Sequence, residues 1–222
     1  MAKIQIVAAI LFTFATTHVQ AQSTLQVTVF DKQGAPLPQA VVSIATSQHA
    51  ASQTLQRQSQ TATMDQVNRL FDPFILVVQQ GDTVTFPNSD NIRHQVYSFS
   101  QTKPFELPLY SNTESPSLRF NEAGIVVLGC NIHDHMKAYI YVSPYEQSVL
   151  TNAQGQAQLA VGATSLSVWY PGISESPAEA MTVPVAANQT TIQVQLPVLV
   201  QSQNPPPPSA LQQRFNRLRN NN

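Results

Sequence analysis

The sequence predicts an all-β protein made of two small β-sandwiches. Short apolar segments recur along the chain, most of them alternate apolar and polar residues, and turn-forming residues separate them. No long helical pattern follows residue 21, and regularly spaced short strands are typical of a sandwich. The chain of 222 residues is long enough for one large or two small domains.

The N-terminus has the pattern of a secretory signal peptide. Lys3 is followed by an apolar stretch, residues 4–15, and then by a polar segment that ends in Val19-Gln20-Ala21. A basic start, an apolar centre and a small residue at the cleavage site are typical of such a peptide. We therefore expect residues 1–21 to be removed and the mature protein to lie in the periplasm. The alternative is an uncleaved anchor, although the apolar run is too short for a spanning helix.

Composition argues against several classes of partner. The formal net charge is −1 and only 10% of residues are charged, which gives no reason to expect a nucleic acid or another polyanion. No later segment is long and apolar enough for stable membrane insertion.

Cys130 is the only cysteine, so no internal disulfide forms in a compartment where cysteines usually pair. A leftover cysteine is a free thiol, an intermolecular bridge, a metal ligand or a buried apolar side chain.

The first strands follow the signal peptide directly. Residues 25–30 alternate apolar and polar with period two, and Asp31-Lys32-Gln33-Gly34 has the chemistry of a turn. Residues 35–44 predict an extended start and a second strand. Residues 46–60 are rich in Gln, Ser and Ala and show little apolar periodicity, so we expect a loop or linker there.

Later strands divide into two groups separated by turns. A unit spanning residues 61–144 contains the expected strands 74–78, 83–86, 93–99, 118–120, 125–128 and 138–142. The following stretch contains a turn and strand over 151–159 and further strands at 166–170 and 190–196. From residue 201 the chain has a run of prolines and then a basic tail, and residues 201–222 are predicted to be a disordered tail.

Three potential metal ligands lie together after the apolar run that ends at Leu128. Cys130, His133 and Met136 have the spacing C-x2-H-x2-M, and the run before them predicts a strand that enters a loop. His94 opens another strand after a polar loop and is the candidate for a fourth ligand. One thiolate and two imidazoles in a plane, with a long axial thioether, form the arrangement of an electron-transfer copper site.

The sequence is also compatible with other uses of these residues. Zinc held by one cysteine and two histidines is the main metal alternative. Catalysis by the Cys-His pair lacks a separate orienting acid and an oxyanion motif, so no enzyme activity is predicted. His135 could compete with Met136 for the axial position, or it could be an exposed docking residue, and Asp134 could hydrogen-bond an imidazole.

On this motif, the segment from Phe74 to Val142 resembles the cupredoxin family. The ligand loop is similar to that of amicyanin, and the run from Asn88 to His94 also matches an Asn-x5-His pattern of that group. The resemblance implies a Greek-key sandwich that binds copper as Cu(I) and Cu(II) through His94, Cys130, His133 and Met136. The chain as a whole resembles bacterial secreted proteins labelled methylamine utilization proteins, a name that does not establish a role in amine oxidation.

The sequence departs from the cupredoxin pattern next to the predicted ligands. Gln95 stands where Asn is common, and this substitution could loosen the link between the two ligand loops. Asn131 follows the cysteine in place of Ser or Thr, and Ile132 precedes His133 where Pro is frequent. Changes around the ligands tune a metal site rather than prevent binding.

The segments on either side of this unit resemble two parts of one carboxypeptidase regulatory-like, transthyretin-like domain. Residues 25–44 match its start, and Thr151 to Gly172 match its continuation, including Trp169-Tyr170-Pro171-Gly172. We therefore expect residues 22–50 and 146–200 to form a split sandwich around the cupredoxin-like domain, with two tandem domains as the alternative. Insertion into a surface loop is tolerated when the ends of the inserted domain lie close together.

Together these features predict a periplasmic copper protein that carries single electrons. Its partner would be an unidentified periplasmic redox protein or copper donor. The alternatives are a copper carrier or sequestering protein without electron transfer, and a non-redox binding module whose metal is structural or absent.

Overall fold

The computed structural model describes residues 24–45, 57–111, 115–160, 164–173 and 179–201, together with residues 211, 213, 214, 217 and 218 near the C-terminus. The predicted signal peptide and its cleavage point at Ala21 lie outside the described residues, as does most of the linker after residue 45. Within the described part of the chain, no helix is long and apolar enough to cross a membrane. The described residues of the tail between 211 and 218 are helical, a structure that the sequence analysis did not predict.

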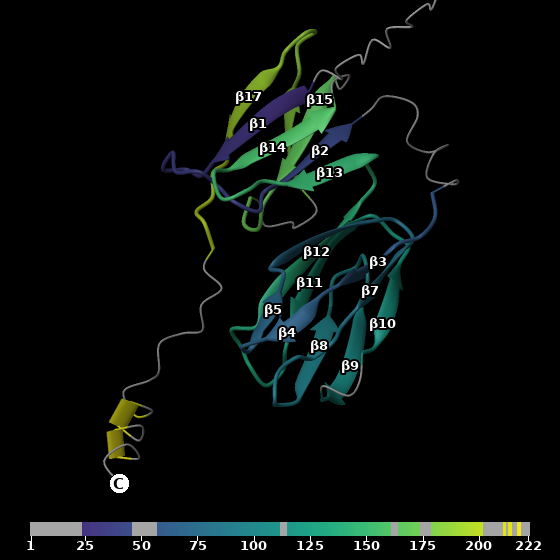
Figure 1. Ribbon diagram of the computed structural model, residues 1–222, viewed down its shortest axis with the longest axis vertical. Helices are drawn as coiled ribbons and strands as arrows, with labels where there is room; N and C mark the ends of the chain where they lie inside the picture. Colours follow the sequence, from purple (N-terminus) through teal and green to yellow (C-terminus); the bar gives the residue numbers. More distant parts are fainter. Residues whose placement is uncertain are drawn as a thin grey trace, which may run out of the picture.

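The all-β prediction is confirmed, and the strands form two bodies (Figure 1). The upper body in this view, called here the flanking sandwich, contains the sheets β14-β1-β17 and β13-β2-β15-β16. Its strands are β1 (Thr24–Phe30), β2 (Val41–Ala45), β13 (Gln147–Leu150), β14 (Gln156–Ala160), β15 (Ser165–Trp169), β16 (Met181–Pro184) and β17 (Thr191–Gln195).

The lower body, called here the central sandwich, contains the sheets β6-β12-β11-β8-β9 and β10-β7-β3 and the β4-β5 hairpin. Its strands are β3 (Thr61–Thr63), β4 (Asp65–Val67), β5 (Leu70–Asp72), β6 (Ile75–Gln79), β7 (Asp82–Thr85), β8 (His94–Ser98), β9 (Phe105–Tyr110), β10 (Ser117–Phe120), β11 (Gly124–Gly129) and β12 (Lys137–Ser143).

Strands from two distant parts of the chain build the flanking sandwich. β1 pairs antiparallel with β14, from Thr24 opposite Ala160 to Thr28 opposite Gln156, and parallel with β17. β2 pairs antiparallel with both β13 and β15. The chain therefore leaves the flanking sandwich after β2, forms the central sandwich and returns at β13. The assignment of the flanking sandwich to the transthyretin-like family stays a prediction.

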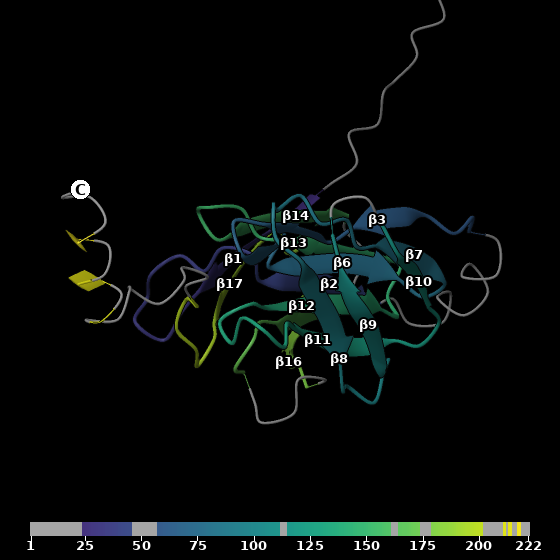
Figure 2. The ribbon, with the colours of Figure 1, turned by 90° about the horizontal axis from the view of Figure 1, so that it is seen from below.

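The sheet β6-β12-β11-β8-β9 has one face in each of the two hydrophobic cores. Seen from below, strands of the two sandwiches overlap (Figure 2). Strand β12 shows how this sheet faces both cores, because its alternate residues point in opposite directions. Ala138, Ile140 and Val142 are buried in the core of the central sandwich. Tyr139 and Tyr141 point the other way and pack against Trp169 of β15, with ring centroids 5.7 Å apart in both pairs.

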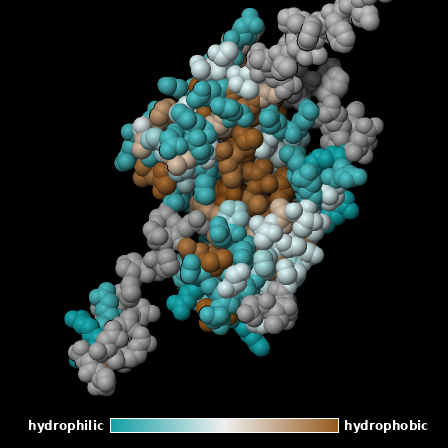
Figure 3. Space-filling model, in the orientation of Figure 1, coloured by the Kyte–Doolittle hydropathy of each residue, from teal (hydrophilic) through white to brown (hydrophobic). Residues whose placement is uncertain are grey.

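A short chain of hydroxyl groups accompanies these aromatic contacts between the two sandwiches. The Oγ atom of Ser148 lies 2.7 Å from Ser43 Oγ and 2.7 Å from Ser143 Oγ, so it bridges β2 of the flanking sandwich and β12 of the central one. Buried hydroxyl groups need hydrogen-bond partners, and these three serve as partners for one another. In the face shown in Figure 3, hydrophobic surface gathers near the middle of the molecule, and hydrophilic surface dominates both ends.

Candidate metal centre

The five-stranded sheet of the central sandwich brings the predicted ligands together at the ends of two neighbouring strands. His94 is the first residue of β8, and Cys130 follows the last residue of β11 directly. β8 and β11 are antiparallel neighbours that pair at Tyr97 and Gly129. The end of β11 and the start of β8 therefore lie at the same edge of the sheet, where the loop that carries His133 and Met136 returns to β12.

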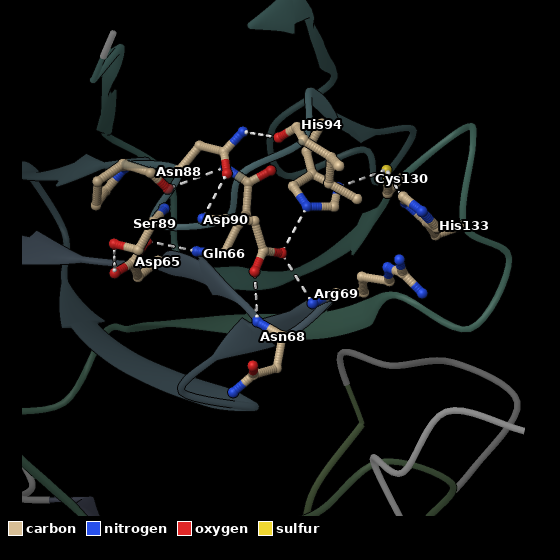
Figure 4. A network of polar contacts seen from close by, with 12 residues as sticks. Asp65, Gln66, Asn68, Arg69, Asn88, Ser89, Asp90, His94, Cys130 and His133 are labelled. Atoms are coloured by element: carbon tan, nitrogen blue, oxygen red, sulfur yellow. Dashed lines mark hydrogen bonds and ion pairs between the residues drawn. The ribbon is translucent and has the colours of Figure 1, made fainter. Parts of the chain in front are cut away.

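Three of the predicted residues form a compact cluster. The Sγ atom of Cys130 lies 3.9 Å from Nδ1 of His94 and 3.8 Å from Nδ1 of His133. One ligand atom from each of the three side chains can be chosen so that all lie within 4.8 Å of one another. The two imidazole rings are tilted by 55°, with centroids 5.0 Å apart. The nearest nitrogen of each ring to the sulfur is therefore Nδ1 (Figure 4).

Met136 lies in the buried part of the same loop. The backbone N–H of His133 donates to the carbonyl of Cys130 at 3.4 Å, and that of Met136 donates to the carbonyl of His133 at 2.9 Å. These two successive turns fold the loop back beside the end of β11. Met136 is 1% exposed and belongs to the same buried cluster as Cys130, which is 3% exposed.

Gly129 and Tyr97 shape the wall next to the sulfur. An added Cβ at Gly129 would lie 2.6 Å from the Tyr97 ring, so a larger side chain would displace that ring. The Tyr97 ring contacts that of Phe99, with centroids 5.0 Å apart and the ring planes tilted by 41°. These residues, with Cys130 and Met136 among the others, line a hollow of about 480 Å³ beside the cluster.

The loop before His94 is held by its own side chains. The amide Nδ2 of Asn88 donates to the carbonyls of Ile92 and Tyr110, at 2.9 and 3.0 Å, and Asn88 Oδ1 accepts the backbone N–H of Asp90. The side chain of Asp90 then reaches His94, whose Nε2 lies 2.7 Å from Asp90 Oδ2. His94 is 0% exposed, so its ring is enclosed by protein on all sides.

The Asp90 carboxyl is surrounded by donors. The backbone N–H groups of Asn68 and Arg69 bind its two oxygens at 2.7 and 2.8 Å, in addition to His94. Burial, the largest single influence, would raise the pKa of Asp90, but these hydrogen bonds and the charge of His94 together lower the pKa below 3.8. Asp90 is therefore a carboxylate at neutral pH.

His133 and His135 lie next to each other at the open side of the cluster, with ring centroids 5.9 Å apart. Burial, followed by the positive charges of His94, His135 and Arg69, lowers the pKa of His133 below 6.5. A lowered pKa favours the neutral imidazole that a metal requires. His135 is directed elsewhere, because its Nε2 donates to the backbone carbonyl of Arg69 at 3.1 Å.

One sequence interpretation needs correction. The carboxylate that hydrogen-bonds an imidazole is that of Asp90, whereas Asp134 is exposed. The expectation for Gln95 agrees with the structure, because its Nε2 donates to Glu106 on β9 at 2.6 Å. Asn88 fixes the backbone of the first ligand loop instead.

Sequence reasoning missed Asp90 as a partner of His94. The premise that no acid orients the Cys-His pair is therefore wrong, because Asp90 Oδ2 lies 2.7 Å from His94 Nε2. The only signal was its position four residues before His94 in a polar loop. The orientation of Asp90 depends on the β4-β5 hairpin, which was also missed because each of its strands has only three residues.

The donor set fits a bound metal ion. For a metal–sulfur bond of about 2.3 Å, a metal–nitrogen bond of about 2.0 Å and ligands 120° apart, sulfur and nitrogen lie roughly 3.7 Å from each other. The observed separations of 3.8 and 3.9 Å are close to this value. Thiolate and imidazole are ligands that suit copper, and they also suit zinc.

No protein-family model matches this chain, and no curated protein matches it significantly. The resemblance to proteins labelled methylamine utilization proteins therefore stays a prediction, as does the resemblance to transthyretin-like domains.

Solved structures similar to part of the chain include copper proteins. An oxidized mutant of amicyanin is 25% identical, with 37% of this chain and 81% of that chain covered and a TM-score of 0.35. A purple cupredoxin from Nitrosopumilus maritimus is 22% identical, with 37% and 99% covered and a TM-score of 0.34. A copper-containing nitrite reductase from Thermus scotoductus SA-01 is 25% identical, with 52% and 28% covered and a TM-score of 0.37. All three TM-scores are below 0.5, so the assignment of the site rests on its own geometry.

Proposed function

We propose that this chain is a copper protein that carries single electrons, and that His94, Cys130, His133 and Met136 would hold the copper. The observation that carries the proposal is the approach of two imidazole Nδ1 atoms to one buried sulfur, at 3.9 and 3.8 Å. A thiolate, two imidazoles and a thioether are the ligands of copper electron-transfer sites.

The arrangement of the ligands supports rapid electron transfer. Bound copper would supply the one-electron change between Cu(I) and Cu(II). His94 and Cys130 are attached to two paired strands of one sheet, and both are buried. Ligands that the fold holds in place do not have to move between the two oxidation states, so little energy is spent on reorganisation. The cysteine needs no separate base, because a bound metal deprotonates it.

We further propose that the protein works in the periplasm, after removal of the signal peptide, with a redox protein or a copper donor as its partner. His133 is only half-buried, and Ile132 beside it is 50% exposed. This edge of the site is where a partner can approach the ligand set. No enzyme activity and no nucleic-acid partner are part of the proposal.

Metal analysis and a redox titration of the purified protein test this function. We expect about one copper per chain, retained in the presence of equimolar zinc, and a reversible one-electron change. Reversible redox behaviour separates an electron carrier from a copper carrier or sequestering protein. If the purified protein holds only zinc, or no metal at all, it is a non-redox binding module.

A further inference from the structure

The imidazole of His94 contacts a different partner at each of its two nitrogens. Its Nδ1 lies 3.9 Å from Cys130 Sγ, and its Nε2 lies 2.7 Å from Asp90 Oδ2. Because the ring is 0% exposed, water does not substitute for either partner. Figure 4 shows His94 between the sulfur on one side and the Asp90 carboxylate on the other.

Asp90 is held in place as a hydrogen-bond acceptor. Its Oδ1 accepts the backbone N–H of Asn68 at 2.7 Å, and its Oδ2 accepts that of Arg69 at 2.8 Å. A carboxylate has only acceptor sites, so the third contact requires His94 Nε2 to be the donor. In the neutral ring the proton then lies on Nε2, and Nδ1 presents its lone pair toward the sulfur.

The two backbone donors belong to the turn of the β4-β5 hairpin. Val67 pairs with Leu70, so the turn consists of Asn68 and Arg69, whose φ angles are 56° and 60°. Two residues with positive φ are typical of a type I′ turn. The carbonyl of Arg69 also accepts His135 Nε2 at 3.1 Å. One turn therefore contacts both the loop that precedes His94 and the loop that carries His133.

We propose that Asp90, held by the β4-β5 turn, is a positioning residue that fixes Nδ1 of His94 as the metal-binding atom and increases electron donation by that imidazole. The inference rests on the proposed function, since the metal concerned is copper. Carboxylates that accept the second N–H of a metal-binding histidine fix its tautomer and raise its basicity. A negative charge near the metal stabilises Cu(II) more than Cu(I), so Asp90 lowers the reduction potential.

The Asp90→Asn variant tests the effect on the metal, with Asp65→Asn as its matched control. Asp65 lies on β4, and its carboxylate accepts hydrogen bonds from the hydroxyl of Ser89 and from the backbone N–H of Gln66, both at 2.7 Å. We expect Asp90→Asn to weaken Cu(II) binding about 10- to 100-fold, with a smaller loss for Cu(I). Each tenfold difference between the two losses raises the one-electron potential by about 59 mV. Asp65→Asn should leave both affinities unchanged, and equal potentials in the two variants would overturn the proposal.

A measurement without metal separates this inference from the proposed function. NMR of the ring nitrogens in the metal-free wild-type protein should show His94 as the neutral Nε2–H form, with a slowly exchanging Nε2 proton. In Asp90→Ala that proton should exchange at least tenfold faster. An Nδ1–H form in the wild type, or equal exchange in both proteins, contradicts the positioning role. A wild type that has the Nε2–H form but binds no copper contradicts the proposed function alone.

Discussion

The two histidines of the cluster contribute differently to the site. His94 is 0% exposed and anchored through Asp90, whereas His133 is half-buried in a loop next to His135. One imidazole is therefore fixed from within the protein, and the other lies at the edge of the site. This difference makes His94 the more rigid of the two ligands.

Substitution of Met136 by Leu tests which residue is the axial ligand. Leu fills nearly the same buried volume, so the free energy of unfolding of the metal-free protein should change by less than about 1.5 kcal/mol. The loss of the thioether should raise the reduction potential, because a donor to the more highly charged Cu(II) is removed. Voltammetry of the copper-loaded variants measures this change.

His135→Gln is the control for that experiment. Since His135 Nε2 donates to the Arg69 carbonyl, its replacement should leave the potential unchanged. A changed reduction potential in His135→Gln, with no change in Met136→Leu, would make His135 the axial ligand.

The sequence predicted the residues of the cluster better than their surroundings. Two sequence features were sufficient to predict which residues lie close together: the spacing of Cys130, His133 and Met136, and the strand start at His94. They were sufficient because neighbouring strands of a sheet bring their ends together. The contact of Asp90 with His94 could not be predicted in this way. It depends on backbone amides more than twenty residues earlier in the chain, and no periodicity in the sequence reports where they point.

At the level of elements, the carboxylate of Asp82 links β7 to the segments on either side. It accepts two hydrogen bonds from Arg57, at 2.6 and 2.9 Å, and the backbone N–H groups of Gln60 and Gln79. Its side chain is 5% exposed. Burial, the largest influence, would raise the pKa of Asp82, but the hydrogen bonds and the charge of Arg57 lower it below 3.8.

Asp82→Asn should reduce the free energy of unfolding near neutral pH by roughly 1.5–3 kcal/mol, the usual value of a hydrogen bond to a charged group. Because the folded pKa is below the unfolded value, this stabilisation is present above pH 3.8 and is lost as the pH falls through the folded pKa. Urea unfolding of both proteins over a range of acidic pH measures the difference.

Asp134→Asn, at an exposed position, is the control and should match the stability of the wild type near neutral pH. A difference between wild type and Asp82→Asn that stays constant down to the lowest pH would contradict the charged role of Asp82.

The sequence revealed some elements and missed others for a physical reason. Segments with clear alternation or a continuous apolar run, such as those that form β1 and β12, were predicted close to their observed bounds. The three-residue strands β4 and β5 are too short to show a period. β9 was missed because its sequence, Phe-Glu-Leu-Pro-Leu-Tyr, contains a proline, which argues against a strand interior.

At the scale of the whole molecule, buried aromatic contacts join the two sandwiches. Trp169 is 1% exposed and packs on Tyr139 and Tyr141 of β12, the strand that begins at the end of the ligand loop. Separation of the sandwiches would expose these contacts and the hydroxyl chain beside them. The structure therefore favours one cooperative unit over two independent ones.

Chemical unfolding of the copper-loaded protein tests this cooperativity. Trp169 is the only tryptophan, so its fluorescence reports the contact between the sandwiches. Visible absorption reports the ligand cluster in the central sandwich. The two signals should change in a single coincident transition, as expected of a two-state unit. A change in Trp169 fluorescence that is complete while the visible band persists would mean that the sandwiches unfold separately.

The visible absorption spectrum of the Cu(II)-loaded protein, beside that of Cys130→Ser, tests the central claim most directly. Electron transfer from a thiolate to Cu(II) absorbs visible light strongly, and Cys130 is the only sulfur in the chain that can form a thiolate. The account predicts an intense visible band in the wild type that is absent from Cys130→Ser, together with much weaker copper binding in the variant. A wild type without that band, or a Cys130→Ser variant with full copper binding, would contradict a copper centre built on this cysteine.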